Sequence, residues 1–83
     1  MITKLTIMKI IGYALCLNNI DYTASLEVRK IYPIVEPYAN DPQDYLRIID
    51  ESGEDYLYAN LRFSPIKLPA KLKKQVEESL ALA

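Results

Sequence analysis

The stretch from Tyr45 to Tyr58, with the sequence YLRIIDESGEDYLY, decides the fold class of this chain. Its two ends are rich in aromatic and branched apolar residues, which favour strands. Its centre is polar and contains Gly53, one of only two glycines in the sequence. Glycine adopts positive φ angles at no steric cost, and tight hairpin turns need such angles. The stretch therefore predicts a β-hairpin, with strands at residues 45–50 and 55–59 and a turn at residues 51–53.

Shorter apolar runs on either side of this hairpin predict further strands. Pro33 stands inside the second run, where a residue without an N–H group marks an edge, a bulge or a bend. Residues 18–21 are typical of a turn and residues 36–44 of a loop, because both are rich in Asn and Asp. Residues 59–63 are too few for an α-helix and predict one tight turn. The strands expected outside the hairpin are residues 7–17, 26–36 and 64–68.

The C-terminal residues 70–83 have the periodicity of a helix. Leu72, Val76 and Leu80 recur every four residues and form one apolar stripe. Pro69 precedes them, at a position that proline tolerates well. A helix of this length is marginal alone, so the stripe needs a surface to cover. We expect either the chain's own strands or a second copy to provide it, and we favour the second copy. The three residues are therefore a candidate self-association site.

The layout of five short strands with a tight turn before the last one resembles a Src-homology-3 (SH3) small barrel. Residues 24–32 look like the entry to its second strand, residues 50–53 like its distal turn, and residues 59–63 like its one-turn helix. More narrowly, Asp50–Tyr58 followed by Phe63 is similar to short uncharacterised bacterial and phage proteins with this barrel.

This resemblance covers residues 10–68 and implies a mainly β, SH3-like five-stranded barrel. It carries no assigned activity. Residues 69–83 then form a short helical tail, and residues 1–9 form an N-terminal extension or the start of the first strand.

Composition limits the partners and the compartment. The 83 residues include ten basic and eleven acidic ones, for a net charge of −1, so the whole molecule does not attract nucleic acid or anionic lipid. A single cysteine, Cys16, excludes an intramolecular disulfide and suits a reducing compartment. The apolar N-terminal run is interrupted by Lys9, which argues against a signal peptide or a membrane span. We therefore expect a cytoplasmic protein.

The sequence contains none of the usual catalytic or metal-binding patterns. Histidine, the commonest general base, is absent. Cys16 is expected to be a buried small apolar residue and not a nucleophile. The hairpin carboxylates, Asp50, Glu51, Glu54 and Asp55, lack the spacing of a calcium loop. We expect no catalytic residue, no cofactor and no metal, and so not an enzyme.

Tyrosine occurs seven times, and its apolar ring and polar tip suit both a core and a binding surface. If Leu57 faces the core, Tyr56 and Tyr58 share the other face of their strand, with Tyr45 across the hairpin. Arginines could stack on these rings. The candidate partner surface is therefore Tyr45, Arg47, Tyr56, Tyr58 and Arg62. The alternative is that the tyrosines complete a small core that lacks tryptophan. Without tryptophan, we do not expect a proline-peptide groove.

The function expected from these observations is that of a non-catalytic interaction module that binds a protein partner or a second copy of itself. The first alternative is a nucleic-acid-associated barrel that uses the only basic cluster, Lys67, Lys71, Lys73 and Lys74. Glu77 and Glu78 beside this cluster argue against that alternative. An enzyme of unknown type is the second alternative, and the lack of histidine disfavours it.

Overall fold

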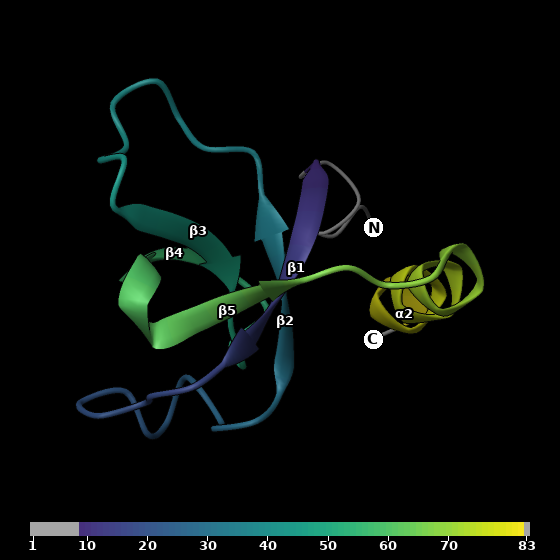
Figure 1. Ribbon diagram of the computed structural model, residues 1–83, viewed down its shortest axis with the longest axis horizontal. Helices are drawn as coiled ribbons and strands as arrows, with labels where there is room; N and C mark the ends of the chain where they lie inside the picture. Colours follow the sequence, from purple (N-terminus) through teal and green to yellow (C-terminus); the bar gives the residue numbers. More distant parts are fainter. Residues whose placement is uncertain (1–8, 83) are drawn as a thin grey trace.

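The computed structural model describes residues 9–82, with side chains as far as residue 79. The elements are β1 (Ile10–Cys16), β2 (Ile31–Val35), β3 (Tyr45–Ile49), β4 (Asp55–Ala59), the 3-10 helix η1 (Asn60–Arg62), β5 (Phe63–Ile66) and helix α2 (Ala70–Leu82) (Figure 1). The expected hairpin, tight turn, last strand and C-terminal helix are confirmed. The first expected strand is confirmed from Ile10 to Cys16, and its residues 7 and 8 lie outside the described residues.

The strands form one antiparallel sheet of five strands in the order β4-β3-β2-β1-β5. A mainly β fold with a short C-terminal helix is therefore confirmed. Strand β1 lies between the second and the last strand of the chain and pairs with both. Strands β4 and β5 are the two edges of the sheet, and no pairing joins them within residues 9–82. Closure of the sheet into a barrel therefore stays a prediction.

The second strand begins later than the sequence suggested. It was expected from Leu26 but starts at Ile31. Arg29 has a φ of 69°, a left-handed angle that no strand residue adopts, and its N–H group donates to the carbonyl oxygen of Cys16. Leu26 is fully buried within the preceding turn, where its N–H group donates to the carbonyl of Tyr22. The apolar run from Leu26 therefore has two parts: a turn whose Leu26 is buried in the core, and the strand β2. Hydrophobicity alone does not distinguish a buried turn residue from a strand residue.

The main core lies on one face of the curved sheet. It is built from the buried residues Ala14, Cys16, Leu26, Tyr32, Ile48, Tyr58 and Phe63. The aromatic rings meet edge to face, with the Tyr58 and Phe63 ring centroids 6.0 Å apart. Cys16 is completely buried, as expected of a small apolar residue. Burial is the main reason why the pKa of its thiol is raised.

The opposite face of the sheet also buries residues. Tyr13, Val35 and Ile49 are buried but do not belong to the main core cluster. Tyr13 lies opposite Pro33 on β2 and Ile66 on β5, whereas its neighbour Ala14 faces the core. Figure 1 shows α2 on the other side of β1 and β2 from η1, on the side away from the core. The sheet is therefore covered on both faces near β1.

Helix α2 starts where the sequence predicted. The N–H group of Lys73 donates to the carbonyl of Pro69 at 2.8 Å, which makes Pro69 the last residue before the helix. Within the apolar stripe, Val76 is half-buried and Leu72 is exposed. The side chain of Leu80 lies outside the described residues. The stripe is therefore only partly covered by the chain itself.

The hairpin turn depends on Gly53, which has the expected positive φ, at 80°. A Cβ atom at this position would meet no heavy atom within 4 Å, so only the backbone angle would oppose a side chain. We expect Gly53→Val to lower the unfolding free energy by about 1–2 kcal/mol. Gly53→Asn should cost less, because asparagine tolerates this angle. Thermal melts of the three proteins measure the effect, and equal midpoints for Val and Gly would contradict the assigned strain.

Candidate functional site

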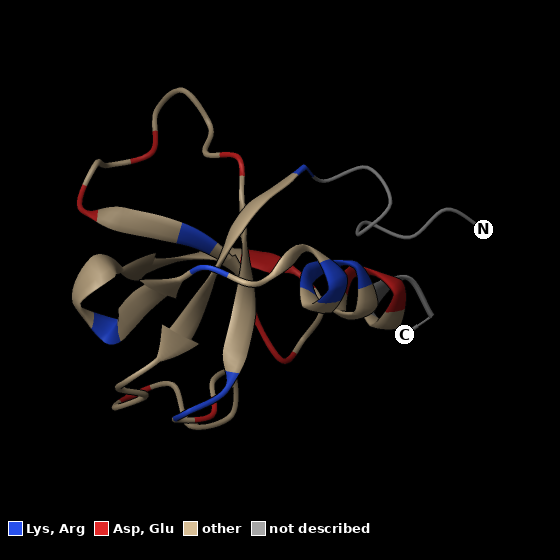
Figure 2. Ribbon diagram, turned by 45° about the vertical axis from the view of Figure 1, so that its right-hand side comes forward, with Lys and Arg blue, Asp and Glu red and all other residues tan. Residues whose placement is uncertain are grey.

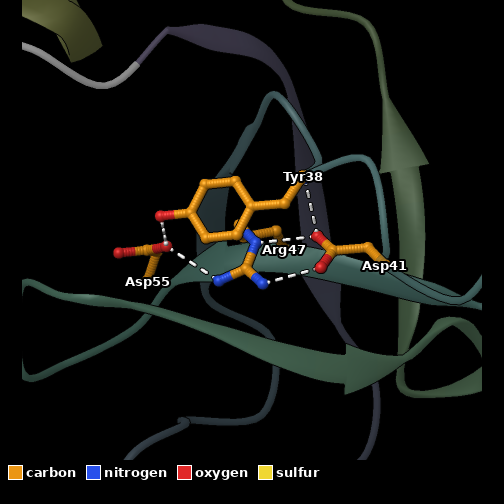
Figure 3. Close-up of polar contacts among 4 residues, drawn as sticks. All are labelled: Tyr38, Asp41, Arg47 and Asp55. Carbon is orange, nitrogen blue, oxygen red and sulfur yellow. Dashed lines mark hydrogen bonds and ion pairs between the residues drawn. The ribbon is translucent and has the colours of Figure 1, made fainter.

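Arg47 is the centre of a cluster of charges on the outer face of β3. Its Nε and one terminal nitrogen donate to the two carboxylate oxygens of Asp41, each at 2.8 Å, and the other terminal nitrogen donates to Asp55 at 2.9 Å (Figure 3). The ring of Tyr38 lies over the guanidinium, 3.9 Å from its central carbon. Because Tyr38 and Asp41 belong to the loop between β2 and β3, the cluster fastens that loop to the sheet.

The hydrogen bonds of the cluster favour the charged forms of Asp41 and Arg47. The hydrogen bonds from Arg47 are the main reason why the pKa of Asp41 is held below its usual value. The same contacts raise the pKa of Arg47. Its side chain is only 12% exposed, and that of Asp55 only 3%. Arg47 is therefore committed to contacts within the chain, which removes it from the partner surface expected from the sequence.

A second polar network holds the hairpin turn against the core. The buried hydroxyl of Tyr58 donates to one oxygen of Asp50 at 2.6 Å. The other oxygen of Asp50 accepts from the N–H group and the hydroxyl of Ser52. Burial first, and then the hydrogen bond to Asp50, raise the pKa of Tyr58 to about 12. The network places the acidic turn at a fixed position beside β4.

Tyr32 anchors the turn from the other side. Its hydroxyl donates to Glu51 at 2.5 Å and accepts from the N–H group of Glu27. Lys30 forms an ion pair with the same Glu51 oxygen at 2.6 Å. The hydrogen bonds from Lys30 and then from Tyr32 hold the pKa of Glu51 below its usual value. The turn is thus connected to the segment before β2 as well as to β4.

Beside the Tyr58–Asp50–Ser52 network lies a groove of about 420 Å³. It is bounded by the turn at Tyr22–Ser25, the hairpin turn at Asp50–Ser52 and strand β4. The groove contains two exposed rings, Tyr22 and Tyr56. We call this feature the tyrosine groove.

One of the two exposed rings is held in place by an arginine. The guanidinium of Arg62 stacks on Tyr22 at 4.6 Å from the ring centroid and donates to the carbonyl of Ile20 at 2.7 Å. The sequence suggested that arginines stack on the rings of Tyr45, Tyr56 and Tyr58, but the ring that Arg62 covers is that of Tyr22. Arg62 therefore supports one edge of the tyrosine groove.

The predicted partner surface is divided by the register of the hairpin. Tyr45 lies opposite Ala59, and Tyr58 lies opposite Leu46, so Tyr45 is on the other face of the sheet from Tyr56 and Tyr58. The premise that Leu57 faces the core was wrong, because Tyr58 belongs to the core cluster and Leu57 does not. Of the five predicted residues, Tyr56 alone both lines the groove and lies outside the core cluster, and Arg62 contacts the groove through the ring of Tyr22.

Sequence reasoning missed Tyr22, Tyr38 and Asp41. All three belong to turns or loops, and they meet the strands through contacts between residues far apart in the chain. A possible signal was the pairing of an isolated basic residue in a strand, Arg47, with acidic residues in the adjoining loop. Such a residue is rarely left without a partner on a half-covered face.

The described residues offer little for other kinds of site. Residues 9–82 contain no group of three His, Cys, Asp or Glu side chains that could hold a metal ion. No helix in this part of the chain is long and apolar enough to cross a membrane. Helix α2 carries basic residues in its first turns and acidic residues after them (Figure 2).

No family model, curated protein or solved structure matches this chain.

Proposed function

We propose that the chain is a non-catalytic interaction module with an SH3-type small barrel. The strand order β4-β3-β2-β1-β5 and the 3-10 helix directly before β5 support this fold. The contact between the rings of Tyr58 on β4 and Phe63 on β5 supports it too, because it brings the two edges of the sheet toward each other. The resemblance to bacterial and phage barrels is part of the same proposal, and so is a cytoplasmic location.

The tyrosine groove carries the functional part of the proposal. Two exposed rings, Tyr22 and Tyr56, stand over a floor that the Tyr58–Asp50–Ser52 network holds rigid. Exposed tyrosines supply contact area at low conformational cost, and a preformed groove reduces the entropy lost on binding. An extended segment of a partner protein matches the size and the mixed polar and aromatic character of this groove.

A protein partner is favoured over nucleic acid by the charge distribution. The groove borders the acidic hairpin turn with Asp50 and Glu51, which would repel phosphates. The lysines of α2 share their helix with Glu77 and Glu78. We therefore expect no tight, salt-dependent binding of generic DNA or RNA. Such binding would favour the nucleic-acid alternative.

Selection from a random-peptide display library tests the groove. We expect peptides that bind the wild-type chain to lose at least about tenfold in affinity with Tyr56→Ser, because interface tyrosines are common hot spots. The matched control is Tyr45→Ser, a strand tyrosine of similar exposure, 43% against 50%, on the opposite face. Peptides that lose affinity equally with both variants, or with neither, would contradict the proposed surface.

Self-association through α2 is the second element of the proposal. Leu72 is exposed and the stripe is only partly covered, so a second copy could complete its burial. We expect the full chain to be a dimer by light scattering and Leu72→Gln to shift it toward a monomer. Lys71→Gln, at the neighbouring position outside the stripe, should leave the dimer unchanged. A wild-type monomer at high micromolar concentration would show that α2 serves its own chain only.

A further inference from the structure

Strand β4 is one edge of the sheet, so one side of its backbone has no neighbouring strand. In an antiparallel ladder, residue pairs that exchange hydrogen bonds alternate with pairs that do not. The N–H group of Asp50 donates to the carbonyl of Glu54, and that of Asn60 donates to the carbonyl of Asp44, which sets the phase of this alternation. Leu57 lies three residues from both Glu54 and Asn60. Its N–H and carbonyl groups therefore point away from β3, toward the open edge.

This edge remains able to accept another strand. Within residues 9–82, no hydrogen bond reaches the backbone of Leu57 from outside the hairpin. Backbone groups that a fold leaves unpaired are nearly always ones that water or a partner can reach. Many natural edge strands carry a proline or a lysine, which hinders pairing with another chain. The other edge, β5, contains Pro65, whereas β4 contains neither residue type.

The tyrosine groove follows the same edge. Its lining includes three consecutive residues of β4, namely Tyr56, Leu57 and Tyr58. Consecutive side chains of a strand point to opposite faces, so contact with all three places the groove along the edge of the strand and not over one face. The turn at Tyr22–Ser25 forms the opposite wall. A segment that lies in the groove is therefore beside the unpaired backbone groups of Leu57.

Asp50 gives the groove a negative charge that the chain does not compensate. The residue lines the groove and is 6% exposed. Its carboxylate accepts from the hydroxyls of Ser52 and Tyr58, which are neutral donors. The nearby carboxylates of Asp55 and Glu51 each have a basic partner, but within residues 9–82 Asp50 has none. No lysine or arginine lines the groove, so its field favours a cation.

We propose that β4 binds an extended basic segment of a partner protein, which adds to the sheet as a sixth, antiparallel strand. This inference rests on the proposed function of the tyrosine groove and specifies its ligand. One residue of the segment exchanges both backbone hydrogen bonds with Leu57. The next residue lies opposite Tyr56 on the groove side and is a lysine or an arginine. Its cation lies over the half-exposed ring of Tyr56 and in the field of Asp50.

A second copy of the chain fits this edge less well. If two β4 strands paired antiparallel about Leu57, the residues beside the acidic end of the strand would be Ala59 and Asn60, which are neutral. Asp50 would then stay without an opposite charge. The basic segment is therefore the occupant that the groove favours.

Peptides selected on the wild-type chain from a random library are the probe for this pairing. A single N-methyl group on the peptide backbone should weaken binding at least about tenfold at the residue paired with Leu57, because it removes a donor and obstructs β4. At the residues on either side, whose amides point away from β4, the loss should be less than about threefold. Equal losses at all positions, or at none, would overturn strand addition.

The charge is tested on the same peptides. We expect a lysine or an arginine at the position after the one paired with Leu57. Replacing that arginine by citrulline, which has the same shape but no charge, should weaken binding about fivefold. Peptides that bind as tightly without a basic residue would overturn the basic character of the partner.

The matching variant of the chain is Leu57→Pro, which removes the outward N–H group, and edge strands tolerate proline at such positions. Its affinity for the selected peptides should fall at least about tenfold. Leu57→Ala keeps the N–H group and should bind within about threefold of the wild type. Circular dichroism checks that both variants fold, and the N-methylated peptides carry the test on the wild-type chain if Leu57→Pro does not. Unchanged binding by folded Leu57→Pro would contradict the pairing.

Failure of this inference differs from failure of the proposed function. Peptides that depend on Tyr56 but tolerate every N-methyl group would leave the groove as the binding surface and overturn strand addition alone. A selection that yields no peptide, or only peptides independent of Tyr56, would overturn both. A dimer in light scattering that folded Leu57→Pro abolishes would mean that a second copy occupies the edge, against the proposal.

Discussion

Replacing Arg47 by methionine is expected to destabilise the protein by about 3 kcal/mol, near the lower end of what breaking a buried ion pair costs. Methionine keeps most of the apolar stem but leaves the buried Asp55 carboxylate without its guanidinium partner. It also removes the two hydrogen bonds to Asp41 that hold the loop before β3. A domain this small has little stability to spare, so a large part of the population could unfold. Urea denaturation followed by circular dichroism measures the change.

The control for this prediction is Arg62→Met. Arg62 is less buried, stacks on Tyr22 and donates to a backbone carbonyl, so its loss should cost less than about 1 kcal/mol. Arg47→Lys should recover only part of the stability, because an ammonium group cannot bond Asp41 bidentately and reach Asp55 as well. If Arg47→Met and Arg62→Met unfold at the same urea concentration, the cluster does not hold the loop as the geometry indicates.

The second large effect is expected in alkali. The pKa of Tyr58 is about 12 in the folded chain, against an ordinary value of 10.0. A raised pKa means that the folded state keeps the proton longer than the unfolded state. The stabilisation is therefore complete below about pH 10 and is lost as the pH rises toward 12. A shift of about two pKa units corresponds to a loss on the order of 3 kcal/mol from this residue alone. The pKa values of Tyr13 and Tyr32 are also raised, so their contributions change in the same direction.

Urea melts at several pH values between 9 and 12 measure this loss. Tyr58→Phe should be less stable than the wild type at neutral pH, since Asp50 loses one hydrogen bond, by about 1 kcal/mol. Its stability should then fall less steeply above about pH 10. Tyr45→Phe, at an exposed position, should follow the wild-type curve. A parallel decline in wild type and Tyr58→Phe would mean that this phenol does not carry the effect.

The parts of the fold that sequence could predict are those encoded locally. The hairpin around Gly53, the turn before β5 and the helix after Pro69 depend on residues close to one another in the chain. The beginning of β2 could not be predicted in this way, because the left-handed Arg29 carries no sequence signal comparable to a glycine.

The candidate site was less predictable than the fold. Tyrosines were recognised as important, but their division between core and surface depends on the register of β3 against β4. Successive residues of a strand point to opposite faces, so an error of one residue in choosing the inward-facing position exchanges the two faces. The assumption that Leu57 faces the core placed its neighbour Tyr58 on the surface, although Tyr58 lies in the core. The tyrosine groove and the Arg47 cluster each need a loop that only tertiary contacts position. No local pattern contains that information.

The place of β1 in the sheet has a consequence for how the protein is made. Residue 13 lies opposite residue 66, so the first strand cannot complete its pairing until the last strand has been synthesised. During translation, the nascent chain must wait in a partly assembled state until β5 leaves the ribosome tunnel. Pairing between such distant segments is slow, and the open edge of β1 is exposed to other chains meanwhile. Synthesis rate and chaperone supply should therefore affect the yield of this protein more than its small size suggests.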